Sequence, residues 1–258
     1  MNNSFINYKY LQSFDRKKFL ENQPFPWYNF HNFLTEQGFQ KLFQDFPRLE
    51  LFERHQGLAR VHGQRPHNRY YLAYETSIYD RLDRKDKGVI SKNNLPPSWQ
   101  MFIQELESSQ LYQNFIRSLF EVRDFQIRYA WHMGVTNSEV SPHTDAAQKI
   151  GTHIFYFNTS DDWGTSWNGE TLVLGHKHND VMNPDFSDFA TIIPARLTNS
   201  HSFIFKNTPN AWHGVKPLTC PEGKYRKLFN VIFETPQSRR PLSRPQRILK
   251  KAFSSWRS

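Results

Sequence analysis

The sequence predicts an α+β domain in which N-terminal helices support a β-sandwich or barrel. Two observations carry this prediction: apolar residues recur at helical spacing in the first half of the chain, and short β-rich segments separated by turns follow residue 122. The 258 residues suffice for one large core, and no repeat or low-complexity linker divides them. We therefore expect a single domain over residues 1–236, with a helical or lid part at about 1–122 and a β core at about 123–236, followed by a basic tail at 237–258.

The first half is expected to be mainly helical. Residues 25–30 read as a short strand behind a proline. Thr35 is a good N-cap for a helix whose apolar side chains recur at i, i+3, i+4 and i+7, and Pro47 ends it. A Pro-Pro-Ser run opens a second helix, and a Ser-Ser pair caps a third that carries Leu111 on its apolar side. Residues 54–72 are rich in Arg and His, so we expect a strand and a basic loop, which is either a lid for an acidic substrate or a charged surface loop.

The second half is expected to supply the sheets. Its β-rich segments lie at 125–133, 152–158, 171–175, 190–193, 202–206, 213–216 and 226–233. Because alternate residues of a strand share a face, Arg226, Leu228, Asn230 and Ile232 are expected to point inward together. We expect His132 to be an ordinary residue at a strand end.

Composition excludes a membrane span and indicates a compartment. Mean hydropathy is −0.73, and no apolar run approaches the roughly eighteen residues that a spanning helix needs. The single cysteine, Cys220, permits no disulfide within the chain and favours a reducing compartment, so we expect a cytoplasmic protein. Seven basic residues after Ser238 supply most of the net charge of +9. This tail is either a solvated extension or a basic amphipathic segment that contacts an anionic surface.

Three side chains form a candidate metal site. His143 and Asp145 are two residues apart, so at a strand end both can point toward one ion. His213 lies far downstream, in a turn that follows an apolar strand. Two histidines and one carboxylate are the ligands that hold non-haem Fe(II) on one face and leave other positions open. His-x-Asp alone is a weak signal, and the prediction depends on what surrounds it.

An arginine and two tyrosines strengthen the prediction. Arg226 opens an otherwise apolar strand, where a guanidinium needs an anion or solvent. Tyr129 and Tyr156 lie on strands that flank the His-x-Asp pair, and their hydroxyls could hydrogen-bond the same acid. Together these residues favour a metal site beside a site for an anion.

The order and spacing of these motifs resemble the prolyl 4-hydroxylase-like branch of the Fe(II)- and 2-oxoglutarate-dependent oxygenases. The resemblance covers roughly residues 24–236. It is carried by Ile127-Arg128-Tyr129, Pro142-His143-Thr144-Asp145, Ile154-Phe155-Tyr156-Phe157-Asn158, Gly169-Glu170-Thr171-Leu172, Trp212-His213-Gly214-Val215 and Arg226-Lys227. One departure is the longer gap between His213 and Arg226, which we read as a longer hairpin turn at 219–223.

This resemblance implies a double-stranded β-helix, a jelly-roll or cupin-like barrel, with iron at its open end. His143, Asp145 and His213 would bind Fe(II). Arg226 would pair with the distal carboxylate of 2-oxoglutarate, and Tyr156 would hydrogen-bond the same carboxylate. Tyr129 would lie near the co-substrate or the substrate.

The implied activity is that of a dioxygenase using Fe(II), 2-oxoglutarate and O2, with ascorbate as an accessory reductant, and releasing succinate and CO2. It would hydroxylate an unactivated C–H bond of an amino acid, a peptide or protein, or another small molecule. A prolyl residue is the substrate that the resemblance favours. The Asp145 carboxylate favours hydroxylation or desaturation over halogenation. Two alternatives stay open: an inactive β-barrel that binds partners through its basic tail, and a Zn²⁺ hydrolase, which needs a general base beside the metal but not Arg226.

Overall fold

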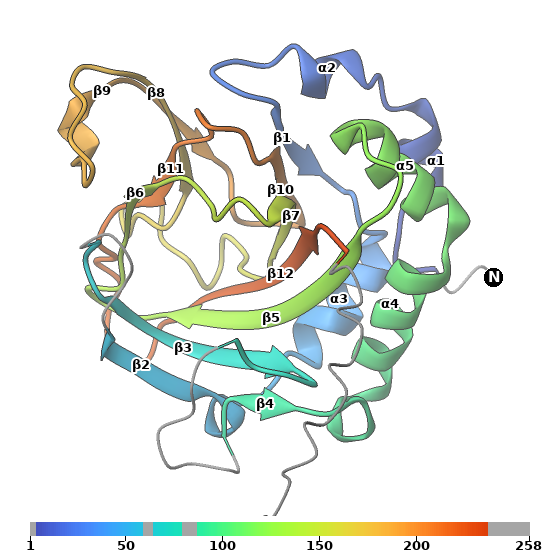
Figure 1. Cartoon of the computed structure of the whole chain (residues 1–258). Coiled ribbons are helices and arrows are strands. Elements are labelled where there is room, and N and C mark those ends of the chain that lie inside the picture. The colour runs from blue at the N-terminus through green and yellow to red at the C-terminus, as the bar shows by residue number, and fades with distance from the viewer. Residues whose placement is uncertain (1–3, 59–63, 79–86, 237–258) are drawn as a thin grey trace, which may run out of the picture.

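The computed structural model describes residues 4–58, 64–78 and 87–236, and the basic tail lies outside these ranges. The helices gather on one side of the molecule, over the outer face of a large sheet (Figure 1). They are α1 (Tyr8–Ser13), α2 (Lys17–Leu20), α3 (Glu36–Gln44), α4 (Pro97–Ser108) and α5 (Gln110–Phe120), with short 3-10 turns at η1 (Leu49–Leu51), η3 (Lys92–Asn94) and η4 (Phe186–Asp188). No helix in the described ranges has both the length and the apolarity to span a membrane.

The longer helices begin where the sequence predicts. Thr35 Oγ1 accepts a hydrogen bond from Gly38 N at the start of α3, and Ser109 Oγ accepts one from Tyr112 N at the start of α5. These caps satisfy backbone N–H groups that have no partner inside the helix. The apolar face of α5 differs in one position from the prediction, since Leu111 is 48% exposed and Tyr112 is buried in its place.

Two sheets face each other, and all their strand pairs are antiparallel except that of β3 with β4. The larger one has the order β1 (Trp27–His31), β10 (His201–Lys206), β7 (Lys149–Tyr156), β12 (Arg226–Glu234), β5 (Gln126–Gly134), β3 (His67–Tyr74) and β2 (Glu53–Leu58), with β4 (Val89–Ile90) added beside β3. The smaller one has the order β6 (Val140–His143), β11 (His213–Val215), β8 (Thr171–Lys177) and β9 (Phe189–Ala195). The seven predicted strand segments of the second half are confirmed.

The chain crosses repeatedly between the two sheets. From β5 to β12 it visits the larger sheet with β5, β7, β10 and β12 and the smaller one with β6, β8, β9 and β11. Strands that alternate between two facing antiparallel sheets form a jelly roll. The predicted α+β architecture, with helices supporting a jelly-roll barrel, is therefore confirmed.

Two local predictions are wrong. The helical half contributes β2 and β3 as a paired hairpin, where we expected one strand and a loop over 54–72. The residues between His213 and Arg226 do not form a hairpin turn, because β11 belongs to the smaller sheet and β12 to the larger one. In both cases the pairing partner, which the local sequence does not specify, decides the structure.

Each strand of the larger sheet separates two environments. Outward-facing aromatic side chains such as Trp131, Phe155 and Phe229 pack with the helices in the main core. Inward-facing residues such as Ile154 and Leu228 belong to a smaller core between the sheets or line a cavity. The helices thus brace the sheet from behind and leave its inner face available for a site.

Trp99 of α4 is fully buried at the centre of the main core. Its ring centroid lies 4.9 Å from that of Phe229 and 5.2 Å from those of Trp131 and Phe157. We expect Trp99→Ala to lower the free energy of unfolding by about 3–5 kcal/mol, because it removes these contacts and leaves a cavity. Urea unfolding measures the loss. Met101→Ala on the exposed side of the same helix is the control, with an expected change below about 0.5 kcal/mol; equal losses would contradict this account of the core.

Candidate metal centre and anion site

The two histidines lie side by side because their strands pair. In the smaller sheet His143 of β6 is the cross-strand partner of His213 of β11, and their ring centroids are 4.3 Å apart. His143 Nδ1 lies 3.0 Å from Ser141 O, and His213 Nδ1 lies 2.9 Å from Ala211 O. A carbonyl oxygen only accepts, so each Nδ1 carries the proton and each Nε2 keeps its lone pair. The backbone thus sets both imidazoles in the form that binds a metal.

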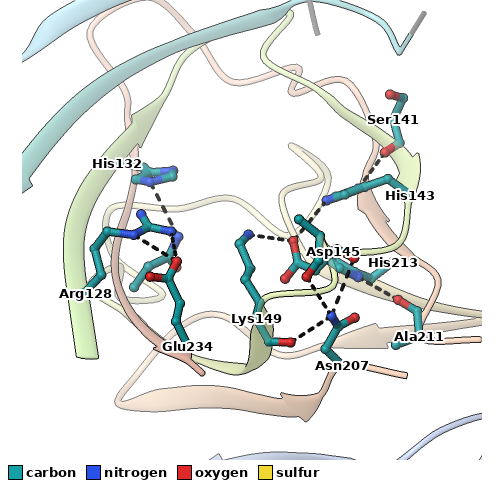
Figure 2. Close-up of polar contacts among 12 residues, drawn as sticks. Arg128, His132, Ser141, His143, Asp145, Lys149, Asn207, Ala211, His213 and Glu234 are labelled. Carbon is teal, nitrogen blue, oxygen red and sulfur yellow. Dashed lines mark hydrogen bonds and ion pairs between the residues drawn. The ribbon is translucent and has the colours of Figure 1, made fainter. Parts of the chain in front are cut away.

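Asp145 completes the cluster from the turn that follows β6. One of its carboxylate oxygens, Oδ1, lies 3.9 Å from His143 Nε2 and 2.7 Å from Lys149 Nζ (Figure 2). Burial raises the pKa of Asp145, but the positive charge of Lys149, and those of His213 and His143 once acid protonates them, outweigh burial and hold the pKa at about 2. The carboxylate is therefore ionised near neutral pH, as metal binding requires.

The turn that carries Asp145 is held by Asn207, the residue that directly follows β10. Asn207 Nδ2 lies within hydrogen-bond distance of three backbone carbonyls, at 3.1 Å from Ala146 O, 3.0 Å from Lys149 O and 3.5 Å from Asp145 O (Figure 2). One side chain thus fixes the shape of the turn. Sequence reasoning did not identify this residue.

The donor set fits a divalent transition metal. One atom each from His143, Asp145 and His213 lie within 4.8 Å of one another, the one such group of three in the described part of the chain. A metal about 2.1 Å from each donor needs them roughly 3 Å apart, which small side-chain rotations achieve. Two imidazoles and one carboxylate leave other positions of an octahedral ion open. The three predicted ligands are brought together.

Arg226 forms a second polar cluster at the start of β12. Its side chain is 7% exposed. Its guanidinium donates to Gly169 O and, at 3.3 Å, to Thr171 Oγ1, and it lies over the ring of Tyr156. Burial lowers the pKa of Arg226, against the smaller opposing effects of Tyr156 and Glu170. Within the described residues its hydrogen bonds go only to uncharged oxygens, so an anionic ligand would complete the site.

Thr171 is a residue of this cluster that sequence reasoning missed. Its hydroxyl oxygen accepts from Tyr156 Oη at 2.7 Å and from Arg226 Nη2. A threonine hydroxyl has two acceptor positions and one donor, so the Thr171 O–H remains available to a ligand. Tyr156, by contrast, is 1% exposed and gives its own hydrogen to Thr171. In this structure the Tyr156 hydroxyl therefore bonds Thr171, and a direct bond from Tyr156 to a ligand stays a prediction.

A single cavity of about 1020 Å³ joins the two clusters. His143, Asp145, His213, Arg226 and Thr171 all line it. Inward-facing residues of the larger sheet complete the wall: Arg69, Tyr71, Arg128, His132, Thr152, Ile154, Leu228, Asn230 and Ile232. The predicted inward register of β12 is confirmed.

The structure does not bring Tyr129 to this site. Its ring stacks on Phe229 in the main core, with centroids 5.6 Å apart, on the face of the sheet that the helices cover. Burial and the nearby Glu107 raise its pKa. The prediction for Tyr129 is wrong because the inward residues of β5 have the opposite parity. His132, which we expected to be ordinary, lines the cavity instead and receives a hydrogen bond from Arg69 at 3.2 Å.

The low pKa of Asp145 predicts a specific acid sensitivity in the metal-free protein. A folded-state pKa of about 2, below the ordinary 3.8, means that Asp145 stabilises the fold above about pH 4 and loses this effect as the pH falls toward 2. The expected loss is about 2 kcal/mol. Urea unfolding with a chelator present should show a weaker dependence over this range in Asp145→Asn. Asp161→Asn, at an exposed carboxylate, should follow the wild type; identical curves for all three proteins would contradict the assignment.

Comparisons with known proteins find likeness in structure alone. No family model and no curated protein sequence matches the chain. A prolyl 4-hydroxylase from Pseudomonas putida is similar with a TM-score of 0.56 at 12% identity, over 88% of this chain and 100% of that one. A prolyl 4-hydroxylase structure from Phytophthora capsici gives 0.56 at 10%, over 93% of this chain and 70% of that one. A 2OG-Fe(II) oxygenase-family oxidoreductase from Burkholderia pseudomallei gives 0.50 at 14%, over 86% and 91%.

At these identities the likeness concerns architecture. It extends over most of the chain in both prolyl 4-hydroxylase structures. The expected double-stranded β-helix is confirmed. The chain therefore has the jelly-roll fold of the prolyl 4-hydroxylases and of other 2OG-Fe(II) oxygenases.

Proposed function

We propose that the protein is a non-haem Fe(II)- and 2-oxoglutarate-dependent dioxygenase that hydroxylates an unactivated C–H bond. The observation that carries the proposal is the buried Arg226, whose described partners are uncharged, in the same cavity as the His143, Asp145 and His213 cluster. A metal site alone would suit many reactions. A metal site with a buried guanidinium nearby suits a co-substrate that has a chelating end and a carboxylate end.

Each residue of the site would have a distinct role in this function. His143, Asp145 and His213 would hold Fe(II), which supplies oxygen activation when bound. Arg226 and Thr171 would bind the distal carboxylate of 2-oxoglutarate through a charge-assisted contact and the free Thr171 O–H. Tyr156 would keep the Thr171 hydroxyl oriented through the hydrogen bond that it donates to Thr171 Oγ1. Succinate and CO2 would be the products from the co-substrate.

The substrate is proposed to be an amino acid, a peptide or protein, or a comparable small molecule, with a prolyl group the first to test. Two of the similar structures are prolyl 4-hydroxylases. A carbocyclase, SnoK from nogalamycin biosynthesis, shares the fold at a TM-score of 0.52 and 11% identity, so the fold admits other outcomes. The Asp145 carboxylate supports hydroxylation over halogenation. We further propose a reducing, cytoplasmic location, in keeping with the single, buried Cys220.

Anaerobic addition of Fe(II) and 2-oxoglutarate tests the function directly. We expect a visible metal-to-ligand charge-transfer band, because only a metal chelated by the co-substrate gives one. His213→Ala, which removes one ligand, is the blank. A folded wild-type protein without the band would refute the proposal and favour an inactive barrel or a zinc site. A succinate-release screen across substrate classes then identifies the substrate.

Arg226→Met tests the anion site separately from the metal. We expect the affinity of the Fe(II)-loaded protein for 2-oxoglutarate to fall about 100-fold, because a buried charge-assisted contact is lost. Thr171→Val should cost about tenfold, since it removes one neutral hydrogen bond. Titration of the charge-transfer band measures both. Fe(II) affinity without 2-oxoglutarate should stay within about twofold of wild type, and unchanged 2-oxoglutarate affinity in Arg226→Met would contradict the assigned role.

A further inference from the structure

We propose that Lys149 is a positioning residue for the metal, one that restricts Asp145 to a single-oxygen bond with it. This inference rests on the metal site of the proposed function. Lys149 lies on β7, four residues after Asp145, and lines the cavity beside it. It was not among the site residues predicted from the sequence.

The Lys149 ammonium group already occupies one oxygen of the metal-binding carboxylate. Nζ lies 2.7 Å from Asp145 Oδ1, the oxygen that faces His143 Nε2 at 3.9 Å. The two side chains are 23% and 8% exposed, so water competes little for this contact. The Lys149 ammonium group thus holds a positive charge beside the metal site. It balances the negative charge of the Asp145 carboxylate before any metal binds.

Lys149 is itself fixed at its main chain. Its amide N donates to Ala146 O at 3.0 Å, and its carbonyl accepts from Asn207 Nδ2 at 3.0 Å. The ammonium group therefore reaches Asp145 from a backbone that is hydrogen-bonded on both sides.

The Lys149 contact affects how many coordination positions of the metal ion the protein would occupy. A metal that shared Oδ1 with the ammonium group would place a divalent and a monovalent cation on one atom, and their repulsion disfavours chelation through both oxygens. With two histidines and one carboxylate oxygen, three of the usual six positions stay open. A chelating co-substrate would need two of these positions, which would leave one for O2. Chelation by both Asp145 oxygens would remove one of these positions.

Lys149→Met tests the inference because it should change the affinity for the metal and the affinity for 2-oxoglutarate differently. We expect the affinity for Mn(II) to stay equal or rise, because a competing cation is removed and both oxygens become available. We expect the Mn(II)-loaded protein to bind 2-oxoglutarate about tenfold more weakly, because the freed carboxylate competes for a position. Calorimetry measures both. Lys149→Arg keeps the charge and should restore 2-oxoglutarate binding.

Lys177→Met is the matched control. Lys177 also lines the cavity, but its Nζ donates to Val181 O at 3.0 Å and lies over the ring of Trp212, away from the carboxylate. This variant should change neither affinity. It separates a specific effect of Lys149 from a general loss of positive charge in the cavity.

The absorption of the Co(II)-loaded protein reports the coordination directly, without 2-oxoglutarate. We expect its d–d bands to shift in Lys149→Met and to return to the wild-type positions in Lys149→Arg. Parallel loss of both affinities in Lys149→Met, or unchanged 2-oxoglutarate binding with unchanged Co(II) bands, would overturn the inference. A wild-type protein that binds metal but not 2-oxoglutarate would instead refute the proposed function, and the Co(II) bands would still test Lys149.

Discussion

The pairing of β6 with β11 is the interaction on which the site depends. It sets His143 opposite His213 and so brings together two residues far apart in the chain. The pairing also positions the backbone carbonyls that fix the tautomer of each imidazole. A shift of one residue in this register would turn one imidazole to the other face of the sheet, because neighbouring side chains point in opposite directions. The metal centre thus depends on the register of β6 and β11 as well as on the identity of its three side chains.

The two faces of the larger sheet have different roles: one packs against the helices and the other lines the cavity. Its outer face carries an aromatic layer that packs on α3, α4 and α5, and near the centre Phe229 of β12 contacts Trp99 of α4. Its inner face carries polar and charged groups such as Arg226 and His132, which an apolar core would not tolerate without partners. Arg226 is hydrogen-bonded to Gly169 O and Thr171 Oγ1, and His132 receives a hydrogen bond from Arg69. The helices at the back supply the burial that the inner face does not.

Local sequence patterns were enough for the elements whose signals are local. Capping residues and apolar spacing predicted α3, α4 and α5, and short β-rich runs predicted the strands of the barrel. The His-x-Asp spacing and Arg226 predicted the two clusters. What failed depends on partners distant in sequence. The hairpin of β2 and β3 is held by pairing with β5, and the face of Tyr129 follows from packing against the helices.

Supporting residues were the hardest to predict. Thr171 and Asn207 become recognisable only when β8 and β10 are placed beside their neighbours. Neither lies in a motif that carries its chemistry in one segment. Lys149 follows Asp145 closely, yet its contact depends on the shape of the turn between them. Ligands can therefore be found by spacing, whereas the residues that orient them require the fold.

The two-faced sheet also bears on how this protein could change over evolution. Positions on the inner face, including Arg128, His132 and Asn230, contact the cavity rather than the aromatic layer. Exchanging them alters the shape and polarity offered to a substrate while the packing on the helices stays intact. A scaffold of this kind can acquire new specificities through few substitutions, each made at a modest risk of unfolding. The same separation makes those three positions the natural starting set for a designed library of altered substrate range.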